Sequence, residues 1–162
     1  IYLAGGAGVE RGLYYKRRDY TKIVEGRNPN VAHEFLGSDV EGKDVVVIDD
    51  MISSGESMID VATELKRRKA NRIFVASTFG LFTNGLEKFD KAFSSGLIYR
   101  LMTTNLVYQP EELLKKEYYI NVDMSKYIAL LINTLNHDAS IAGLLDPSER
   151  IQRILKNYEK NK

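Results

Sequence analysis

The run from Val45 to Ser57 constrains the fold of this chain more than any other part of the sequence. It begins with four apolar residues, three of them valine, which predict a short buried strand. Two aspartates, Asp49 and Asp50, follow, then a loop of small hydroxyl residues and glycine, and then a helix start. In open α/β sheets, ligands bind beyond the carboxyl ends of the strands, and helix N-termini hold phosphate. The run therefore predicts a cradle for a phosphorylated sugar, with the two acids holding hydroxyls or a metal.

The composition is that of a globular domain with a substantial core. The chain has 162 residues, of which 44% are hydrophobic and 28% are charged. Its net charge of +1 gives no bulk field that favours nucleic acid or an anionic membrane. The absence of cysteine excludes disulfides and suits the cytoplasm, and no apolar run approaches the roughly 20 residues of a membrane helix. We therefore expect a cytoplasmic protein without nucleic-acid or membrane partners.

Strand and helix patterns alternate along the chain, which predicts an α/β fold with a mainly parallel sheet flanked by helices. The apolar strand before the acids should be buried on both faces. The helix at 125–136 is apolar nearly all round, which predicts burial, for example at a subunit interface. The expected strands cover 44–48, 72–78, 97–103 and 118–122. The expected helices cover 56–69, 85–93, 125–136 and 148–158, and a further short helix begins at Pro110.

The two ends of the chain differ in character. The segment Ile1–Ala4 resembles the end of a helix that Gly5 and Gly6 stop, so we expect preceding residues to be missing. Residues 1–145 are expected to form one amino-terminally truncated domain, and residues 146–162 a helical carboxyl-terminal extension.

A basic cluster precedes a long segment without periodicity. Gly12–Tyr15 predicts a strand that ends in Lys16-Arg17-Arg18, and residues 19–31 predict a mobile binding loop. A small hairpin is expected from His33 to Asp44. From charge alone, the basic cluster is compatible with a solvated strand end.

The acid pair by itself is compatible with several structures. Two aspartates at a strand end also cap helices, form ion pairs, and occur in receiver domains and in the Walker B strand of nucleotide hydrolases. A receiver domain does not need the small-residue loop that follows Asp50. A Walker B strand should follow a glycine-rich loop with Lys-Ser or Lys-Thr, and this sequence contains none.

The run from Asp49 to Ser57 resembles the ribose-phosphate-binding signature of two families. These are the type I phosphoribosyltransferases and the ribose-phosphate pyrophosphokinases, which make phosphoribosyl pyrophosphate (PRPP). The resemblance implies that Asp49 and Asp50 bind the ribose hydroxyls. Glu56 departs from the small residue that the signature usually has, and an acid near phosphate is unfavourable unless it faces solvent or a cation. The residues that the resemblance assigns to the 5-phosphate are Ser53, Ser54, Gly55, Glu56 and Ser57.

The basic cluster resembles the catalytic loop of the pyrophosphokinases, which implies that Lys16 and Arg18 contact the transferring phosphoryl group. Such a transfer requires cations at the equatorial oxygens, and arginine offers a bidentate fork. Weaker matches follow in the same order at 78–83, where Phe79 replaces the usual histidine, at 103–105 and at 136–144. The resemblance spans about residues 16–145 and predicts a type I phosphoribosyltransferase-like fold, with the small hairpin next to the catalytic loop.

The resemblance implies a ribose-phosphate pyrophosphokinase fragment, which transfers diphosphate from ATP to ribose 5-phosphate. Mg2+ would arrive largely with ATP, and no metal ligand is assigned within the chain. The family builds its adenine site partly across a subunit interface, which implies a homo-oligomer. Other parts of the active site would precede Ile1, so the chain alone is expected to be inactive.

Two other interpretations stay open. A phosphoribosyltransferase that consumes PRPP shares the cradle but does not need the basic cluster. A non-catalytic synthetase-associated subunit would tolerate a change such as Glu56, although the joint presence of both aspartates, Lys16 and Arg18 argues against it. His33 and His137 lack a second ligand at metal spacing and are expected to be structural or solvated.

Overall fold

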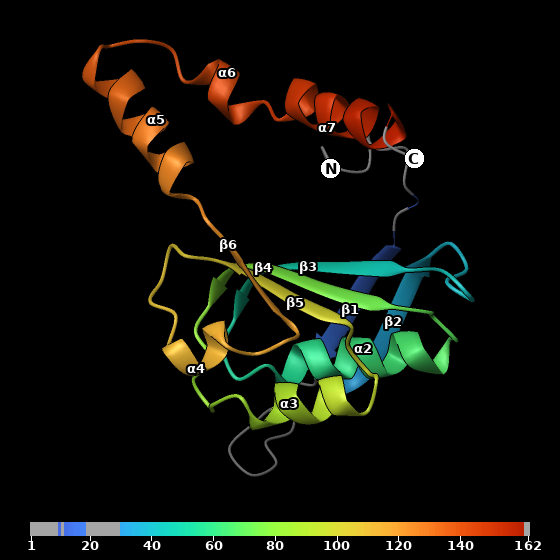
Figure 1. The fold of residues 1–162 in the computed structure, drawn as a ribbon. Helices are drawn as coiled ribbons and strands as arrows, with labels where there is room; N and C mark the ends of the chain where they lie inside the picture. The colour runs from blue at the N-terminus through green and yellow to red at the C-terminus, as the bar shows by residue number, and fades with distance from the viewer. Residues whose placement is uncertain (1–9, 11, 19–29, 161–162) are drawn as a thin grey trace. The chain divides into compact units, whose positions relative to one another are not determined.

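The computed structural model describes residues 10, 12–18 and 30–160 (Figure 1). The expected helix end at Ile1–Ala4 and most of the expected loop, residues 19–29, lie outside this described part. The chain divides into two compact units. One is Val40–Asn136, and the other contains the described residues on either side of it.

The unit Val40–Asn136 is built on a four-stranded parallel sheet, in which the strands lie in the order of the sequence. This arrangement confirms the predicted α/β fold with a mainly parallel sheet. The strands are β3 (Val45–Ile52), β4 (Ile73–Gly80), β5 (Arg100–Thr104) and β6 (Tyr119–Val122). The helices are α2 (Glu56–Arg67), α3 (Glu87–Ser94), α4 (Glu111–Leu114) and α5 (Ser125–Asn136).

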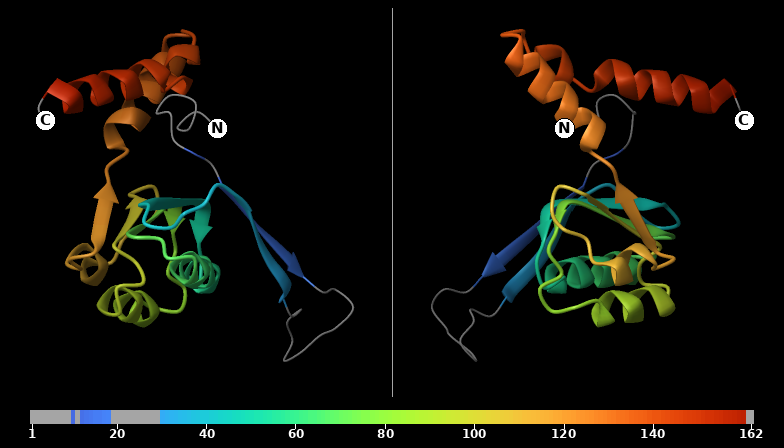
Figure 2. Two further views of the ribbon diagram at one scale, coloured as in Figure 1. Left: turned by 90° about the vertical axis from the view of Figure 1, so that its right-hand side faces the viewer. Right: turned by 60° about the vertical axis from the view of Figure 1, so that its left-hand side comes forward.

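Helices α2 and α3 cover the same face of the sheet (Figures 1 and 2). When parallel strands are added in sequence order, right-handed crossovers place every connecting helix on one side. The core therefore lies between this face and the helices. Its most deeply buried aliphatic and phenylalanine side chains are Ile52, Ala62, Leu65, Ile73, Val75, Phe89, Ile98, Leu101 and Leu113.

The opposite face of the sheet is largely exposed. Val46 and Ile48 of β3 retain 56% and 62% of their accessible surface, and Ile120 and Val122 of β6 are also exposed. The prediction that the first strand is buried on both faces is therefore wrong. Helix α5 has no buried side chain within the described part of the chain, so its expected burial at a subunit interface stays a prediction.

The hairpin is present, but different segments form it. Strand β1 (Gly12–Arg18) pairs antiparallel with β2 (Asn30–Gly37), in a register that places Gly12 opposite Gly37. The expected hairpin at His33–Asp44 is therefore wrong, because residues 33–37 already pair with β1. Gly42, with a φ of 69°, instead lies in a turn that leads into β3.

Two helices complete the carboxyl-terminal part of the chain. These are α6 (Ala142–Leu145), which was not predicted, and α7 (Ser148–Lys160), which extends the predicted last helix by two residues. Arg150 joins them by donating a hydrogen bond to the carbonyl oxygen of Leu144 at 2.8 Å. Among the described residues, no helix is long and apolar enough to span a bilayer.

Glu64 should make folding stability depend on pH in the acid range. Arg67 and Arg68 both donate hydrogen bonds to its carboxylate at 2.8 Å, and these bonds lower the pKa of Glu64 to about 2. A depressed folded-state pKa adds stability that is present above the unfolded pKa of about 4.5 and is lost as pH falls toward 2. We expect Glu64→Gln to cost about 0.5–1 kcal/mol at pH 7, because ion pairs at a helix surface are weak.

Urea denaturation of both proteins at pH 7, 4 and 2.5 measures this effect. The difference in the free energy of unfolding should shrink steadily as pH falls. An equal difference at all three pH values would show that the pairing of Glu64 with the arginines adds no stability.

Candidate functional site

The predicted cradle is formed where β3 passes into α2. Strand β3 ends at Ile52, the residues Ser53–Gly55 turn the chain, and α2 begins at Glu56. Gly55 is the N-cap residue with a φ of 79°, and no side chain of the described residues caps the helix there. The backbone N–H groups of the first helical turn and the positive end of the helix dipole thus meet at this loop, as an anion site requires.

Gly55 is required by space as well as by its backbone angle. A Cβ atom at this position would lie 2.3 Å from Cζ of Phe89, which is itself buried in α3. The aromatic ring therefore packs directly beneath the loop, and only glycine permits this approach. Phe82 meets the same ring edge-on at 5.3 Å between centroids, so two aromatic rings support the cradle from below.

A second loop, Leu81–Thr83, is bonded to the cradle. The N–H groups of Leu81 and Thr83 donate to the carbonyl oxygens of Ile52 and Ser53, at 2.8 and 3.0 Å. The hydroxyl groups of Ser53 and Thr83 also lie 3.3 Å apart. These contacts fix one side of the cradle to the carboxyl end of β4.

The acid pair lies inside the strand rather than beyond it. Strand β3 continues to Ile52, and Asp49 is in register with Ser77 of β4. Both carboxylates are exposed, and the N–H of Asp50 donates to Oδ1 of Asp49 at 2.9 Å. Partial burial and the neighbouring Asp50 carboxylate raise the pKa of Asp49 above its usual value. Adjacent strand residues point to opposite faces, so a ligand that contacts both acids must lie across the edge of β3.

Glu56, the departure from the usual signature, is paired with a cation. Its Oε1 accepts a hydrogen bond from Nζ of Lys88 at 2.8 Å. Lys88 belongs to the first turn of α3, and sequence analysis did not assign it to the site. No local signal predicts this contact, since its partners are 32 positions apart and come together only through the packing of α3.

The residues after β5 connect this strand to the segment before α5 by hydrogen bonds. The Asn105 side-chain amide donates to Asp123 Oδ1 at 2.8 Å and accepts from the Met124 N–H at 2.8 Å. Hydrogen bonds from the Ser125 hydroxyl, the Ser125 backbone and Asn105 lower the pKa of Asp123. The segment Thr103–Asn105 resembles a family motif, and in this chain its asparagine holds β5 to the start of α5.

Gln109 is a second residue that sequence analysis missed. It is only 9% exposed, and its Nε2 donates to the carbonyl oxygens of Thr104 and Val107 at 3.2 and 3.3 Å. It therefore holds the loop after β5 against the carboxyl end of that strand. A buried glutamine in a polar loop gives no pattern in the sequence that distinguishes it from an exposed one.

Lys16 and Arg18 lie on β1, in the other compact unit. Their backbones are in register with His33 and Asn30 of β2, and the pairing shifts between Arg17 and Arg18. Their approach to the cradle stays a prediction. Within the described residues, no three His, Cys, Asp or Glu side chains are grouped as a metal site.

Comparisons with known proteins agree with this geometry. Residues 22–146 match the family model described as the phosphoribosyl synthetase-associated domain. A ribose-phosphate pyrophosphokinase from Shewanella oneidensis is 30% identical over 125 residues, which cover 75% of this chain and 39% of that protein. One from Pyrococcus furiosus is 38% identical over 104 residues, which cover 64% of this chain and 33% of that protein. The chain thus spans about two fifths or less of the length of these curated relatives.

A solved structure shows the same fold. The crystal structure of phosphoribosylpyrophosphate synthetase from Mycobacterium smegmatis superposes with a TM-score of 0.57 at 18% identity. The match covers 67% of this chain and 35% of that one. Since the family model covers most of the chain and includes the whole cradle, this protein belongs to the phosphoribosyl synthetase-associated domain family.

Proposed function

We propose that this chain supplies the ribose-phosphate-binding part of a ribose-phosphate pyrophosphokinase. The observation that carries the proposal is the cradle itself. It combines three features: a helix N-terminus that no side chain of the described residues caps, a glycine at a position where no other residue fits, and two aspartates in the strand that leads to the loop. The curated relatives with this name support the proposal, as does the family match.

In the proposed reaction, the 1-hydroxyl oxygen of ribose 5-phosphate attacks the β-phosphorus of ATP. A bond forms between that oxygen and the β-phosphorus, the bond from the β-phosphorus to the bridging α–β oxygen breaks, and AMP leaves with the electron pair. The hydroxyl loses its proton, and the product is PRPP. Such a transfer depends on positioning and on cations around the phosphoryl oxygens more than on covalent chemistry by the protein.

Each proposed site residue has a part in this reaction. Asp49 and Asp50 accept hydrogen bonds from the ribose hydroxyls, and the backbone of the loop binds the 5-phosphate. Lys16 and Arg18 meet the negative charge on the transferring group. Mg2+ would enter as part of the MgATP substrate and supply positive charge to its phosphate oxygens, and no residue of this chain is assigned as its ligand. The loop residues that hold the phosphate are Ser53, Ser54, Gly55, Glu56 and Ser57.

The chain's organisation is part of the proposal. We assign residues 1–145 to the phosphoribosyltransferase-like domain and 146–162 to a helical extension, and the family match, residues 22–146, ends next to this boundary. The substrates are ATP and ribose 5-phosphate, in a cytoplasmic enzyme that assembles as a homo-oligomer.

Calorimetric titration of the purified chain with ribose 5-phosphate tests the cradle. We expect binding that ribose without its phosphate does not show. Asp49→Asn and Asp50→Asn should each weaken it about tenfold, because each removes a charge-assisted hydrogen bond to a sugar hydroxyl. Asp39→Asn, an exposed acid outside the cradle, is the matched control and should bind as the unmodified protein does.

The same preparation separates the rival functions. A phosphoribosyltransferase would bind PRPP and release pyrophosphate with purine or pyrimidine bases. A non-catalytic subunit would co-purify with an active synthetase and show no turnover in its own full-length form. Absence of ribose 5-phosphate binding by the folded chain would contradict the proposed function.

A further inference from the structure

Lys88 lies outside the signature motif in the sequence, but its side chain contacts the cradle at Glu56. Its ammonium group contacts the carboxylate of Glu56 at 2.8 Å, and the two side chains are 42% and 43% exposed. Glu56 is the first residue of α2, so its backbone N–H is one of the groups that face an incoming phosphate. The ion pair therefore lies at the edge of the proposed phosphate site.

Packing holds the backbone of Lys88 at this position. The next residue, Phe89, is buried and lies directly beneath Gly55. The loop that precedes α3 is bonded to the cradle through Thr83 and Ser53. The start of α3 is thus attached to the cradle on two sides, while the four-carbon side chain of Lys88 remains free to change direction.

The negative charge of the Glu56 carboxylate would repel a phosphate bound in the cradle, and the positive charge of Lys88 offsets this repulsion. The phosphate of a phosphorylated sugar carries nearly two negative charges at neutral pH, and an uncompensated carboxylate beside it would oppose binding. The ammonium group of Lys88 compensates Glu56. Since it has three N–H donors, it can bond to a phosphate oxygen while it still contacts Glu56.

We propose that Lys88 is a phosphate-binding residue of the ribose 5-phosphate site, and that Glu56 orients its ammonium group toward the phosphate. This inference rests on the proposed function and adds a specificity-determining residue to it. Glu56 and Lys88 then form one arrangement. Glu56 stands where the signature usually has a small residue and adds a negative charge beside the phosphate, and the Lys88 ammonium group that it holds compensates that charge.

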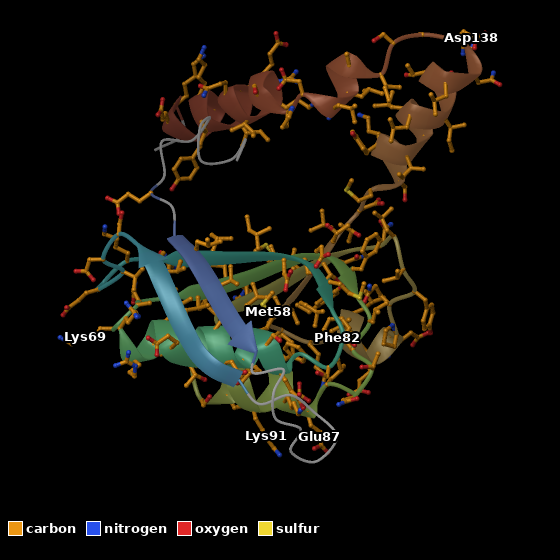
Figure 3. All side chains as sticks on the ribbon, turned by 180° about the vertical axis from the view of Figure 1, so that it is seen from behind. Met58, Lys69, Phe82, Glu87, Lys91 and Asp138 are labelled. Carbon is orange, nitrogen blue, oxygen red and sulfur yellow. The ribbon has the colours of Figure 1, made fainter. Side chains whose placement is uncertain are left out.

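Another ion pair on the same helix serves as a comparison. Glu87 and Lys91 are 3.9 Å apart and 87% and 81% exposed, as expected of an ordinary surface pair. Figure 3 shows both side chains on the outer side of α3, away from the sheet. Lys91 therefore has the same charge on the same helix without access to the cradle.

Four variants of the full chain test the inference by calorimetric titration with ribose 5-phosphate, ribose and inorganic phosphate. They are Lys88→Met, Glu56→Gln, the double variant and Lys91→Met. We expect Lys88→Met to weaken ribose 5-phosphate binding about tenfold or more, since a charged hydrogen bond to the phosphate is lost and the ion pair with Glu56 is broken. The double variant should recover part of this loss, and Lys91→Met should stay within about twofold.

The outcomes separate this inference from the proposed function. If the unmodified chain binds ribose 5-phosphate and Lys88→Met binds it equally well, Lys88 has no part in the site, although the cradle is correct. If Lys91→Met weakens binding as much as Lys88→Met, the effect is one of net charge, and the inference is wrong. If the unmodified chain does not bind ribose 5-phosphate, the proposed function fails first. Circular dichroism of each variant confirms that the fold is retained.

Discussion

Lys16→Ala and Arg18→Ala are each expected to lower turnover about 100-fold or more in an active ribose-phosphate pyrophosphokinase that contains this chain. Loss of a preorganised charge that meets the transition state typically costs on the order of 3 kcal/mol in activation free energy. The KM for ribose 5-phosphate should change little, because other residues, Asp49, Asp50 and the loop 53–57, form the proposed site for this substrate. Steady-state kinetics with ATP and ribose 5-phosphate measures both quantities.

Arg17→Ala is the matched control for this experiment. Arg17 lies between the two proposed catalytic residues on β1 and carries the same charge, but the resemblance assigns no role to it. Its removal should leave turnover within a few-fold of the unmodified enzyme. Near-normal turnover of both Lys16→Ala and Arg18→Ala would show that the catalytic-loop assignment is wrong, whatever the state of the cradle.

Gly55→Ala is expected to destabilise the protein by about 3 kcal/mol and to abolish ribose 5-phosphate binding. The new Cβ would lie 2.3 Å from a ring atom of Phe89, which is buried and cannot move without displacing Phe82. Overpacking of this kind costs about 1–3 kcal/mol, and a non-glycine residue at a φ of 79° adds further strain. Urea denaturation gives the free energy of unfolding, and titration gives the binding.

Gly85→Ala separates the two causes. Gly85 also has a positive φ, 73°, but a Cβ there would meet no atom within 4 Å. This variant should cost only about 1 kcal/mol, from the backbone conformation alone. Equal costs for the two variants would show that the contact of Gly55 with Phe89 does not constrain the cradle.

The order of strands and helices was predictable because it depends on local periodicity. The pattern at 125–136 gave the exact bounds of α5, and the strands at 72–78 and 118–122 were placed within two residues. The hairpin was misplaced because pairing between β1 and β2 spans residues 19–29 without a recognisable turn motif. The short helix α6 lacks the length that periodicity needs, so it was missed.

In the candidate site, too, the features set by local sequence were predictable, and those set by tertiary packing were not. The loop Ser53–Gly55 and the start of α2 were predictable, because a glycine and small hydroxyl residues between a strand and a helix leave few alternatives. The contacts of Phe89 with Gly55 and of Lys88 with Glu56 were not, because they depend on how α3 packs. The predicted roles of Asp49 and Asp50 rest on the resemblance and remain predictions.

The sequence by itself determined the α/β class, the position of the cradle and the glycine at its centre, because periodicity and backbone conformation are local properties. Tertiary structure alone decided the environment of that cradle. It placed β3 at the edge of the sheet in the described part of the chain, with Val46 and Ile48 exposed. The physical reason is topological, since strands added in sequence order through right-handed crossovers have all their helices on one face. The same crossovers bring α3 beneath the cradle and pair Lys88 with Glu56, a contact that no local pattern encodes.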